Sequence, residues 1–170
     1  SSIAVFGAGS VGLAALMAAR VAGCATIFAV DLHENRLELA RELGATEVCK
    51  PGTRSLKDVQ YSVEATGSPQ ALRDAVDCLA PLGACCLVGS ARKGTEVRLE
   101  MTQLQHGRTL RGCIQGDAPP AEFFPLLFEL WRSGRLPVER LIGYYDFADV
   151  NRAVADSLSG KTVKPVLRIS

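Results

Sequence analysis

Short apolar runs alternate with helical patterns along the first two thirds of the chain. Helices are expected at residues 10–23, 33–44 and 68–83, where apolar side chains recur at helical spacing or small residues dominate. Strands are expected in six apolar runs, at residues 2–7, 25–31, 45–51, 61–67, 84–90 and 109–116. This alternation predicts an α/β fold of the Rossmann type, a doubly wound parallel sheet of six strands with helices on both faces.

One connection in this pattern is unusually short. Only residues 52–60, "GTRSLKDVQ", separate the third expected strand from the fourth. A crossover between parallel strands normally takes about a dozen residues and contains a helix. We therefore expect a single helical turn or an extended loop here, which leaves part of one sheet face thinly covered.

The pattern changes after residue 117. Residues 146–160 predict an amphipathic helix, and residues 164–169 predict a last strand. Residues 119–136 predict another amphipathic helix, which we expect to pack against the sheet through Phe123, Phe124, Leu127, Leu130 and Trp131.

Composition narrows the class of protein. The chain has 170 residues, and 48% of them are hydrophobic, which suffices for one compact domain with a substantial core. The 19 basic and 18 acidic side chains are well mixed, so nucleic acid is not an expected partner, and no apolar run is long enough to span a membrane. The six cysteines form no CxxC pair, and the first residues contain no secretion signal, so we expect reduced thiols and a cytoplasmic location.

A glycine fingerprint follows the first expected strand. Residues 7–12, "GAGSVG", match G-x-G-x-x-G between a strand and a helix. In this motif Gly7 permits the tight turn, Gly9 lets a diphosphate approach the backbone, and Gly12 lets the helix lie close to the sheet. The helix that begins at Ser10 then offers free N–H groups and a partial positive charge to the diphosphate.

An aspartate stands at the end of the second expected strand. Asp31 follows Gly7 by 24 residues, and a carboxylate at this position accepts hydrogen bonds from the adenosine ribose and repels a 2′-phosphate. Asp31 therefore favours NAD over NADP, although it could also simply cap the next helix. Arg36, on that helix, could weaken the preference for NAD, reach the ribose from the side, or remain a solvated charge.

Five segments in order resemble the coenzyme-binding half of the medium-chain, zinc-type alcohol dehydrogenases. They are "VFGAGSVGLAALMAARVAG", "AVDLHENRLELARELGAT", "SVEATGSPQALRDAVDCLAPLG", "GRTLRGCIQGD" and "SGKTVKPVL", and together they extend over almost the whole chain. Within the family, "VDLHENRLELARELGA" and "IQGD" resemble the aryl-alcohol dehydrogenase branch.

The resemblance implies a role for each matching residue. Gly7, Gly9, Val11 and Gly12 would form the diphosphate and nicotinamide-side wall, and Ser10 belongs to the same fingerprint. Asp31 and Arg36 would hold the adenosine ribose, and Ala65, Thr66 and Gly67 would border the adenine side. Ser90, Cys113 and Gln115 would offer backbone groups to the nicotinamide carboxamide, and Lys164 would lie near the diphosphate.

The resemblance also implies the reaction and the missing parts. The family oxidises an alcohol to an aldehyde or ketone, with a zinc ion that polarises the oxygen and NAD that takes the hydride. Its zinc ligands lie on a preceding GroES-like domain that this sequence does not contain, so we expect the chain alone to bind NAD without turning over an alcohol. Residues 1–139 would be the NAD-binding domain, and residues 140–170 would return to the catalytic domain.

Two further expectations concern surfaces. Residues from about 118 onward would face the missing domain, so we expect an exposed apolar patch there or a self-association that covers it. Members of the family commonly form homo-oligomers by pairing the sixth strand of one subunit with that of another, and residues 109–116 could do the same.

Alternatives remain at this point. A stand-alone nucleotide sensor would need the same fingerprint, and a zinc-free reductase of the same superfamily would use NADPH, although Asp31 argues against the latter. His106 and Cys113 supply too few ligands for a zinc site, which needs three or four. Glu64 lies in an expected buried strand, where its carboxylate should bond the backbone or a nearby basic group.

Overall fold

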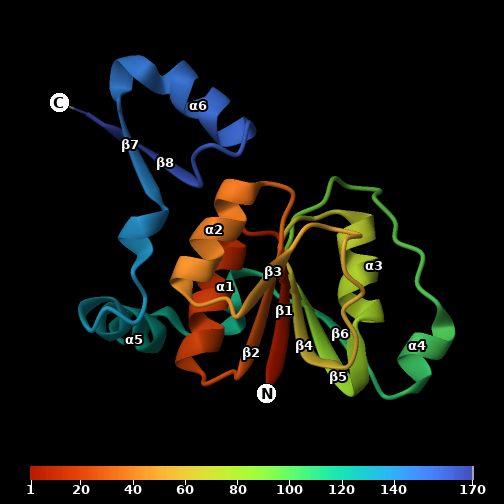
Figure 1. Ribbon diagram of the computed structural model, residues 1–170. Helices are drawn as coiled ribbons and strands as arrows, with labels where there is room; N and C mark the ends of the chain where they lie inside the picture. The colour runs from red at the N-terminus through yellow and green to blue at the C-terminus, as the bar shows by residue number, and fades with distance from the viewer. Residues whose placement is uncertain (170) are drawn as a thin grey trace.

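The computed structural model describes residues 1–169 and contains the predicted six-stranded sheet (Figure 1). The strand order is β3-β2-β1-β4-β5-β6, and every neighbouring pair is parallel. The strands are β1 (Ser2–Phe6), β2 (Thr26–Val30), β3 (Glu47–Cys49), β4 (Val59–Glu64), β5 (Leu79–Leu87) and β6 (Thr109–Gly112). The order reverses between β1 and β4, which is where open sheets of this kind bind ligands.

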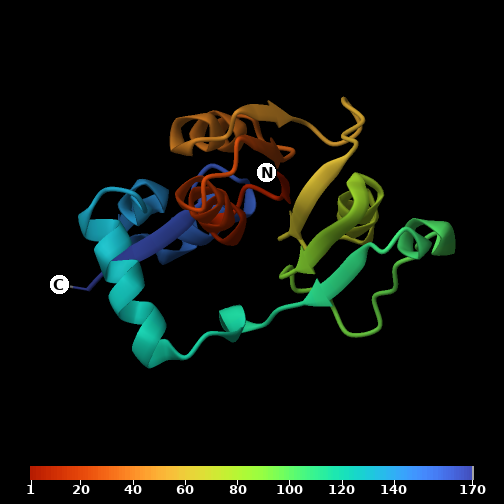
Figure 2. The ribbon, with the colours of Figure 1, turned by 90° about the horizontal axis from the view of Figure 1, so that it is seen from below.

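Helices cover both faces of the sheet, as the sequence predicted (Figures 1 and 2). On one face α1 (Ser10–Val21) and α2 (Glu34–Leu43) enclose a buried cluster that includes Leu13 and Val5. On the other face α3 (Pro69–Asp77) encloses a second cluster that includes Val76 and Ala4. Because side chains alternate along a strand, consecutive residues of β1 serve the two clusters.

The start of α3 was predicted correctly, but its end was not. Ser68 caps the helix by accepting a hydrogen bond from the Ala71 N–H at 3.5 Å, and Pro69 occupies the first turn. The predicted helix continued to residue 83, whereas α3 ends at Asp77 and β5 begins two residues later. Pro81 lacks the N–H that a helix requires at this position, so the chain instead enters the sheet early.

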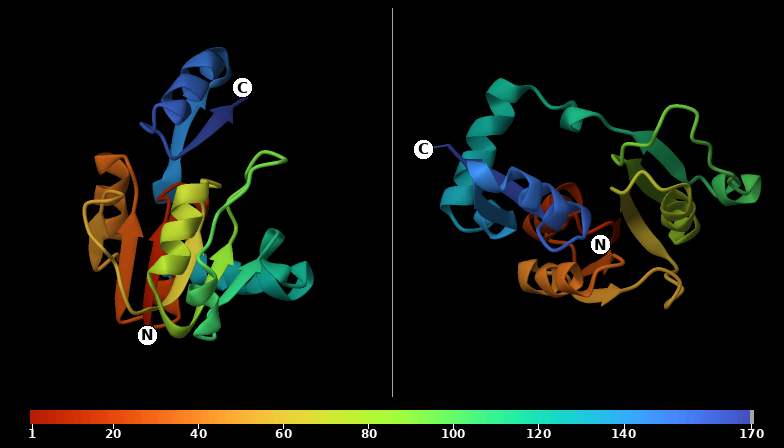
Figure 3. Two further views of the ribbon diagram at one scale, coloured as in Figure 1. Left: turned by 90° about the vertical axis from the view of Figure 1, so that its right-hand side faces the viewer. Right: turned by 90° about the horizontal axis from the view of Figure 1, so that it is seen from above.

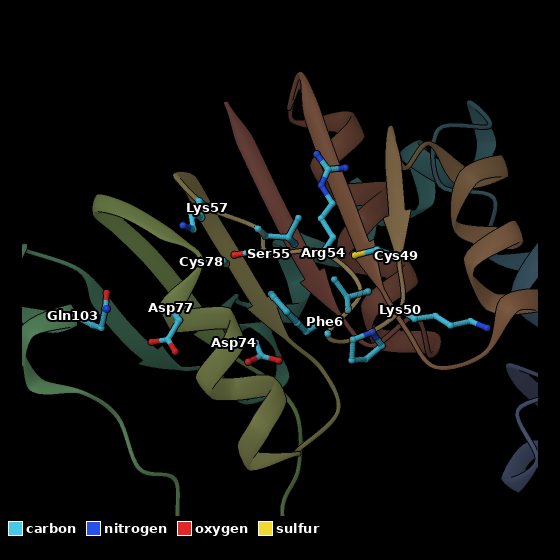
Figure 4. Close-up of a pocket in the computed structure, with 14 residues that line it drawn as sticks. Phe6, Cys49, Lys50, Arg54, Ser55, Lys57, Asp74, Asp77, Cys78 and Gln103 are labelled. Atoms are coloured by element: carbon cyan, nitrogen blue, oxygen red, sulfur yellow. The ribbon is translucent and has the colours of Figure 1, made fainter.

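The connection between β3 and β4 is an extended loop with one turn, as predicted. A cavity of about 370 Å³ lies between this loop and α3 (Figure 4). Cys49 and Arg54 line it from the β3 side, and Asp74 and Cys78 line it from α3. The cavity occupies the place that a crossover helix would otherwise fill, so this part of the sheet face is thinly covered.

The predicted packing of the helix after β6 is wrong. This helix, α5 (Pro120–Arg132), buries only Leu130, which joins the cluster beneath α1, with Leu127 partly buried beside it. Figure 2 shows α5 on the far side of α1 from β4, so it does not lie over the strands. Phe124 and Trp131 are 64% and 47% exposed, so in the single chain α5 carries exposed apolar side chains of the kind expected after residue 118.

The last residues form a small unit of their own. A strand that the sequence analysis missed, β7 (Ile142–Asp146), pairs in parallel with β8 (Lys164–Arg168), and α6 (Val150–Leu158) connects them. The unit lies beyond the carboxyl ends of the large sheet (Figures 1 and 3). The Asn35 side-chain amide donates to the Gly160 carbonyl oxygen at 2.9 Å and so attaches the unit to α2.

The cysteines behave as the sequence predicted. All six are free thiols, and Cys78 and Cys85 lie in the core. Burial raises the pKa of the Cys78 thiol to about 12 and also raises the pKa of Cys85, so neither thiol ionises near neutral pH. No helix among residues 1–169 is long and apolar enough to cross a membrane.

Candidate functional site

The turn after β1 has the geometry that the glycine fingerprint predicts. Gly7 has φ +95°, which favours glycine, and its N–H donates to the Val30 carbonyl oxygen at 2.8 Å. A Cβ atom on Gly12 would overlap the Gly7 carbonyl oxygen and lie 3.3 Å from the Val5 side chain, so α1 packs directly on the turn. A Cβ atom on Gly9 would meet no heavy atom within 4 Å. The surrounding protein therefore leaves open space at Gly9, as expected if a ligand approaches there.

The amino end of α1 faces this space without a capping side chain. Gly9 is the N-cap residue, so no side chain bonds the first N–H groups of the helix. The Ser10 hydroxyl donates to the Val163 carbonyl oxygen at 3.3 Å and so ties the small unit to α1. Lys164, the residue after Val163, is exposed. The free N–H groups and the helix dipole suit an anion.

Asp31 is buried and bonded to two backbone segments. Its Oδ2 accepts a hydrogen bond from the Ala8 N–H at 2.7 Å, and its Oδ1 accepts one from the His33 N–H at 2.9 Å. The side chain is only 6% exposed. His33, not Asp31, is the N-cap residue of α2, so capping that helix is not the main role of the aspartate. The carboxylate instead joins the end of β2 to the glycine turn.

Arg36 carries an unsatisfied polar atom beside this carboxylate. Its Nη1 lies 3.9 Å from Asp31 Oδ2, while its buried Nε has no hydrogen-bond partner among residues 1–169. Buried donors in proteins are nearly always bonded, and one that is not costs about 1–3 kcal/mol. An acceptor supplied by a ligand would satisfy it.

Two cavities receive most of the predicted site residues. The first, of about 500 Å³, is lined by Gly7, Gly9, Asp31 and Arg36 and by Ala65 and Thr66 from the loop after β4. The second, of about 1020 Å³, is lined by Val11, Ser90, Cys113 and Gln115. Because Gly9 and Val11 lie on different cavities, the amino end of α1 stands between them.

Some predicted residues lie behind these walls. Gly67 does not line the first cavity but packs against the loop after β5, where a Cβ atom would overlap the Ser90 carbonyl oxygen. The sequence analysis missed Gln70, Ala71 and Asp74, which line the first cavity from α3. Gln70 bonds Asp74 at 2.8 Å, one helical turn away. Two polar residues one helical turn apart, on the same face of the helix, were the signal available in the sequence.

The fold and these two cavities define a dinucleotide-binding domain of the Rossmann type. The sheet reverses its strand order at the glycine turn, a carboxylate ends the second strand, and an uncapped helix begins between the cavities.

Known proteins with similar sequences and structures narrow the class to a family. The family model of zinc-binding dehydrogenases matches residues 10–132. Geraniol dehydrogenase of Castellaniella defragrans is 33% identical over 98% of this chain and 48% of its own length. Benzyl alcohol dehydrogenase of Acinetobacter calcoaceticus superposes with a TM-score of 0.95 at 39% identity, covering 100% of this chain and 50% of the other. An alcohol dehydrogenase zinc-binding domain protein of Burkholderia ambifaria superposes with a TM-score of 0.94 at 42% identity, covering 100% of this chain and 49% of the other.

The chain belongs to the family of zinc-type medium-chain alcohol dehydrogenases, and it is their coenzyme-binding domain. It spans about half the length of the relatives that it matches.

Proposed function

We propose that the chain forms the NAD-binding half of a zinc-dependent dehydrogenase that oxidises an alcohol. The single observation that carries the choice of NAD is the buried carboxylate of Asp31, a residue that lines the first cavity and bonds the glycine turn. A carboxylate there accepts hydrogen bonds from the two ribose hydroxyls and opposes a 2′-phosphate.

The residues around the cavities fit this cofactor. The orphaned Arg36 Nε gains an acceptor when a ribose oxygen is present, and the space at Gly9 admits a diphosphate to the amino end of α1. Ser90, Cys113 and Gln115 line the second cavity, where their backbone groups would hold the carboxamide of the nicotinamide. Bound NAD supplies the hydride acceptor, and these residues of the chain orient it.

Zinc is proposed only for the remainder of the complete enzyme. Among residues 1–169 no group of three or more histidine, cysteine or acidic side chains is placed to hold a metal ion. We therefore expect this half alone to bind cofactor and to leave an alcohol unoxidised. The proposed boundary lies near residue 139, ahead of the small unit formed by β7, α6 and β8.

The proposed substrate is an alcohol whose hydroxyl-bearing carbon adjoins an unsaturated carbon, with an aromatic alcohol as the first choice. Support comes from the named activities of two relatives, since both benzyl alcohol and geraniol have this arrangement. An assembly through the β6 edge is also proposed, because β6 is the outer strand of the sheet and its residues 109, 111 and 112 are exposed.

Titration of the purified chain with NADH and NADPH, followed by nicotinamide fluorescence, tests the proposal. We expect saturable binding of NADH and binding of NADPH weaker by at least about tenfold, equal to about 1.4 kcal/mol. Preferential binding of NADPH would instead favour a zinc-free reductase. Oxidation of benzyl alcohol by this chain alone would contradict the proposal that this chain binds the cofactor and that the remainder of the complete enzyme supplies the zinc site.

A further inference from the structure

A buried carboxylate lies beneath the two cavities, and no cationic side chain among residues 1–169 pairs with it. Glu64, the last residue of β4, is 0% exposed. Its Oε1 accepts hydrogen bonds from the Thr66 N–H at 2.6 Å, from the Thr66 hydroxyl, and from the Gly67 N–H at 3.0 Å. None of the ion pairs found among residues 1–169 includes it. The sequence analysis expected this carboxylate to bond either the backbone or a nearby basic group. The backbone bonds are confirmed, but burial alone does not explain why an acidic side chain is used.

The same residue contacts the loop after β5. The Glu64 carbonyl oxygen accepts hydrogen bonds from the Val88 and Gly89 N–H groups, both at 2.9 Å. A Cβ atom on Gly89 would overlap Glu64 Oε2 and the Gly67 nitrogen, and it would lie 2.8 Å from the Thr66 nitrogen. The two loops therefore meet at the carboxylate with no room for a side chain between them.

Each loop forms a wall of a different cavity. Thr66 lines the first cavity, next to Asp31, and Gly89 and Ser90 line the second. The Thr66 methyl group also packs against the glycine turn, where a Cβ atom on Gly7 would lie 2.6 Å from it. The Glu64 carboxylate is thus bonded to the loop that lines the first cavity and packs against Gly89 of the loop that lines the second.

We propose that Glu64 is a positioning residue for the dinucleotide, and that it sets the spacing between the adenosine and nicotinamide cavities. The proposal rests on the function proposed above. A ligand that spans both cavities depends on that spacing, whereas a ligand that fills only the first cavity does not. NADH spans both, and AMP carries the adenosine part alone.

The variant Glu64→Gln tests this with little change of shape. An amide offers one oxygen in place of two, and its NH₂ group faces N–H donors, so the bonds to Thr66 and Gly67 cannot all persist. We expect the Kd for NADH to rise by about tenfold, which equals about 1.4 kcal/mol, because displaced cavity walls no longer match both ends of the ligand. The Kd for AMP should rise less than the Kd for NADH, because Thr66 lines the first cavity but AMP does not reach the second one.

Ser62→Ala is the matched control. Ser62 lies on the same strand, is 1% exposed, and donates its hydroxyl to the Ala75 carbonyl oxygen at 2.6 Å on α3, away from both loops. Its loss should lower the unfolding temperature and leave the ratio of the NADH and AMP dissociation constants unchanged. If Glu64 only stabilised the fold, its replacement would leave the ratio of the NADH and AMP dissociation constants unchanged, as Ser62→Ala should.

The outcomes are distinct. Unchanged NADH binding by Glu64→Gln, or equal weakening of NADH and AMP, would overturn the assignment of Glu64. If Glu64→Gln does not fold, Thr66→Val offers a second test, because it removes one donor to the carboxylate without changing the size of the side chain. We expect it to raise the ratio of the NADH Kd to the AMP Kd by about threefold. An unchanged ratio would overturn the assignment of Glu64. A wild-type chain that binds AMP but not NADH would contradict the proposed function itself.

Discussion

Gly9→Ala should weaken cofactor binding while leaving the fold nearly unchanged. Gly9 has φ −79°, a value that alanine adopts freely, and the added methyl group would meet no atom of the protein within 4 Å. Alanine is less favourable than glycine at an N-cap by about 0.5–1 kcal/mol. The unfolded alanine variant also has less conformational entropy, which offsets this by about 0.4–1 kcal/mol. The net change in the free energy of unfolding should therefore stay within about 1 kcal/mol.

In the proposed site, the same methyl group lies where the diphosphate would approach α1. A hydrogen bond to a charged partner contributes about 1.5–3 kcal/mol, so loss of one weakens binding by about tenfold to a hundredfold. Gly12→Ala is the matched control, because its methyl group would overlap the Gly7 carbonyl oxygen, which is a backbone atom. Overpacking of this kind costs about 1–3 kcal/mol. At about 2–4 °C per kcal/mol for a chain of this size, the melting temperature of Gly12→Ala should fall by several degrees.

Thermal unfolding by circular dichroism and NADH titration by fluorescence, both on the same preparations, separate the two effects. We expect Gly9→Ala to melt like the wild type and to bind NADH poorly. If Gly9→Ala binds NADH like the wild type, no diphosphate passes over Gly9. If it melts as early as Gly12→Ala, the space at Gly9 serves the fold and not a ligand.

Three other changes test separate parts of the structure. Asp31→Ser removes the buried carboxylate, so NADH should bind about tenfold more weakly and the gap to NADPH should narrow; a preference that survives this change contradicts the role of Asp31. The Tyr145 hydroxyl and, to a smaller extent, the Lys161 ammonium group lower the pKa of Asp156 below its usual value. The ionised carboxylate therefore stabilises the folded chain at any pH above the usual pKa of an aspartate. This contribution to the free energy of unfolding is lost as the pH falls through the lowered pKa. Tyr145→Phe should therefore flatten the acid side of a plot of melting temperature against pH, below about pH 4, and identical profiles for variant and wild type would refute the contact. Burial raises the pKa of the Cys78 thiol to about 12, so iodoacetamide at pH 8 should leave this thiol unmodified in the folded chain. Peptide mass spectrometry after labelling checks this, and rapid modification of Cys78 would show that the core opens there.

The parts of the structure that follow local rules were predicted from the sequence. The unit of β1, α1 and β2 is specified by short-range signals: an apolar run, three glycines at fixed spacing, and an aspartate at the end of the next strand. Ser68 and Pro69 likewise marked the start of α3 without any tertiary information. In each case the residue acts on backbone atoms a few positions away, so the pattern is enough.

The parts that depend on distant segments were not predicted. The apolar side of α5 suggested packing on the sheet. In the structure Leu130 alone is buried, in the cluster that includes Leu13 of α1, and Phe124 stays exposed. β7 was missed because its partner β8 lies about 20 residues further along the chain, although the run "IGYYD" has the β-branched and aromatic content of a strand. The bond from the Ala8 N–H to Asp31 and the division of the site into two cavities are tertiary features that no local pattern encodes.

The two hydrogen bonds that hold Asp31 have a consequence for selectivity. The Ala8 and His33 N–H groups fix both carboxylate oxygens, so the side chain has lost its rotamer freedom before any ligand arrives. Ordering a side chain at the moment of binding costs about 0.5–1.5 kcal/mol, and here folding has already met that cost. A mobile aspartate could rotate away from the 2′-phosphate of a ligand, whereas the Asp31 carboxylate is held in place by its two hydrogen bonds. In the proposed NAD site, a carboxylate held in this way is expected to favour an unmodified ribose over one that carries a 2′-phosphate.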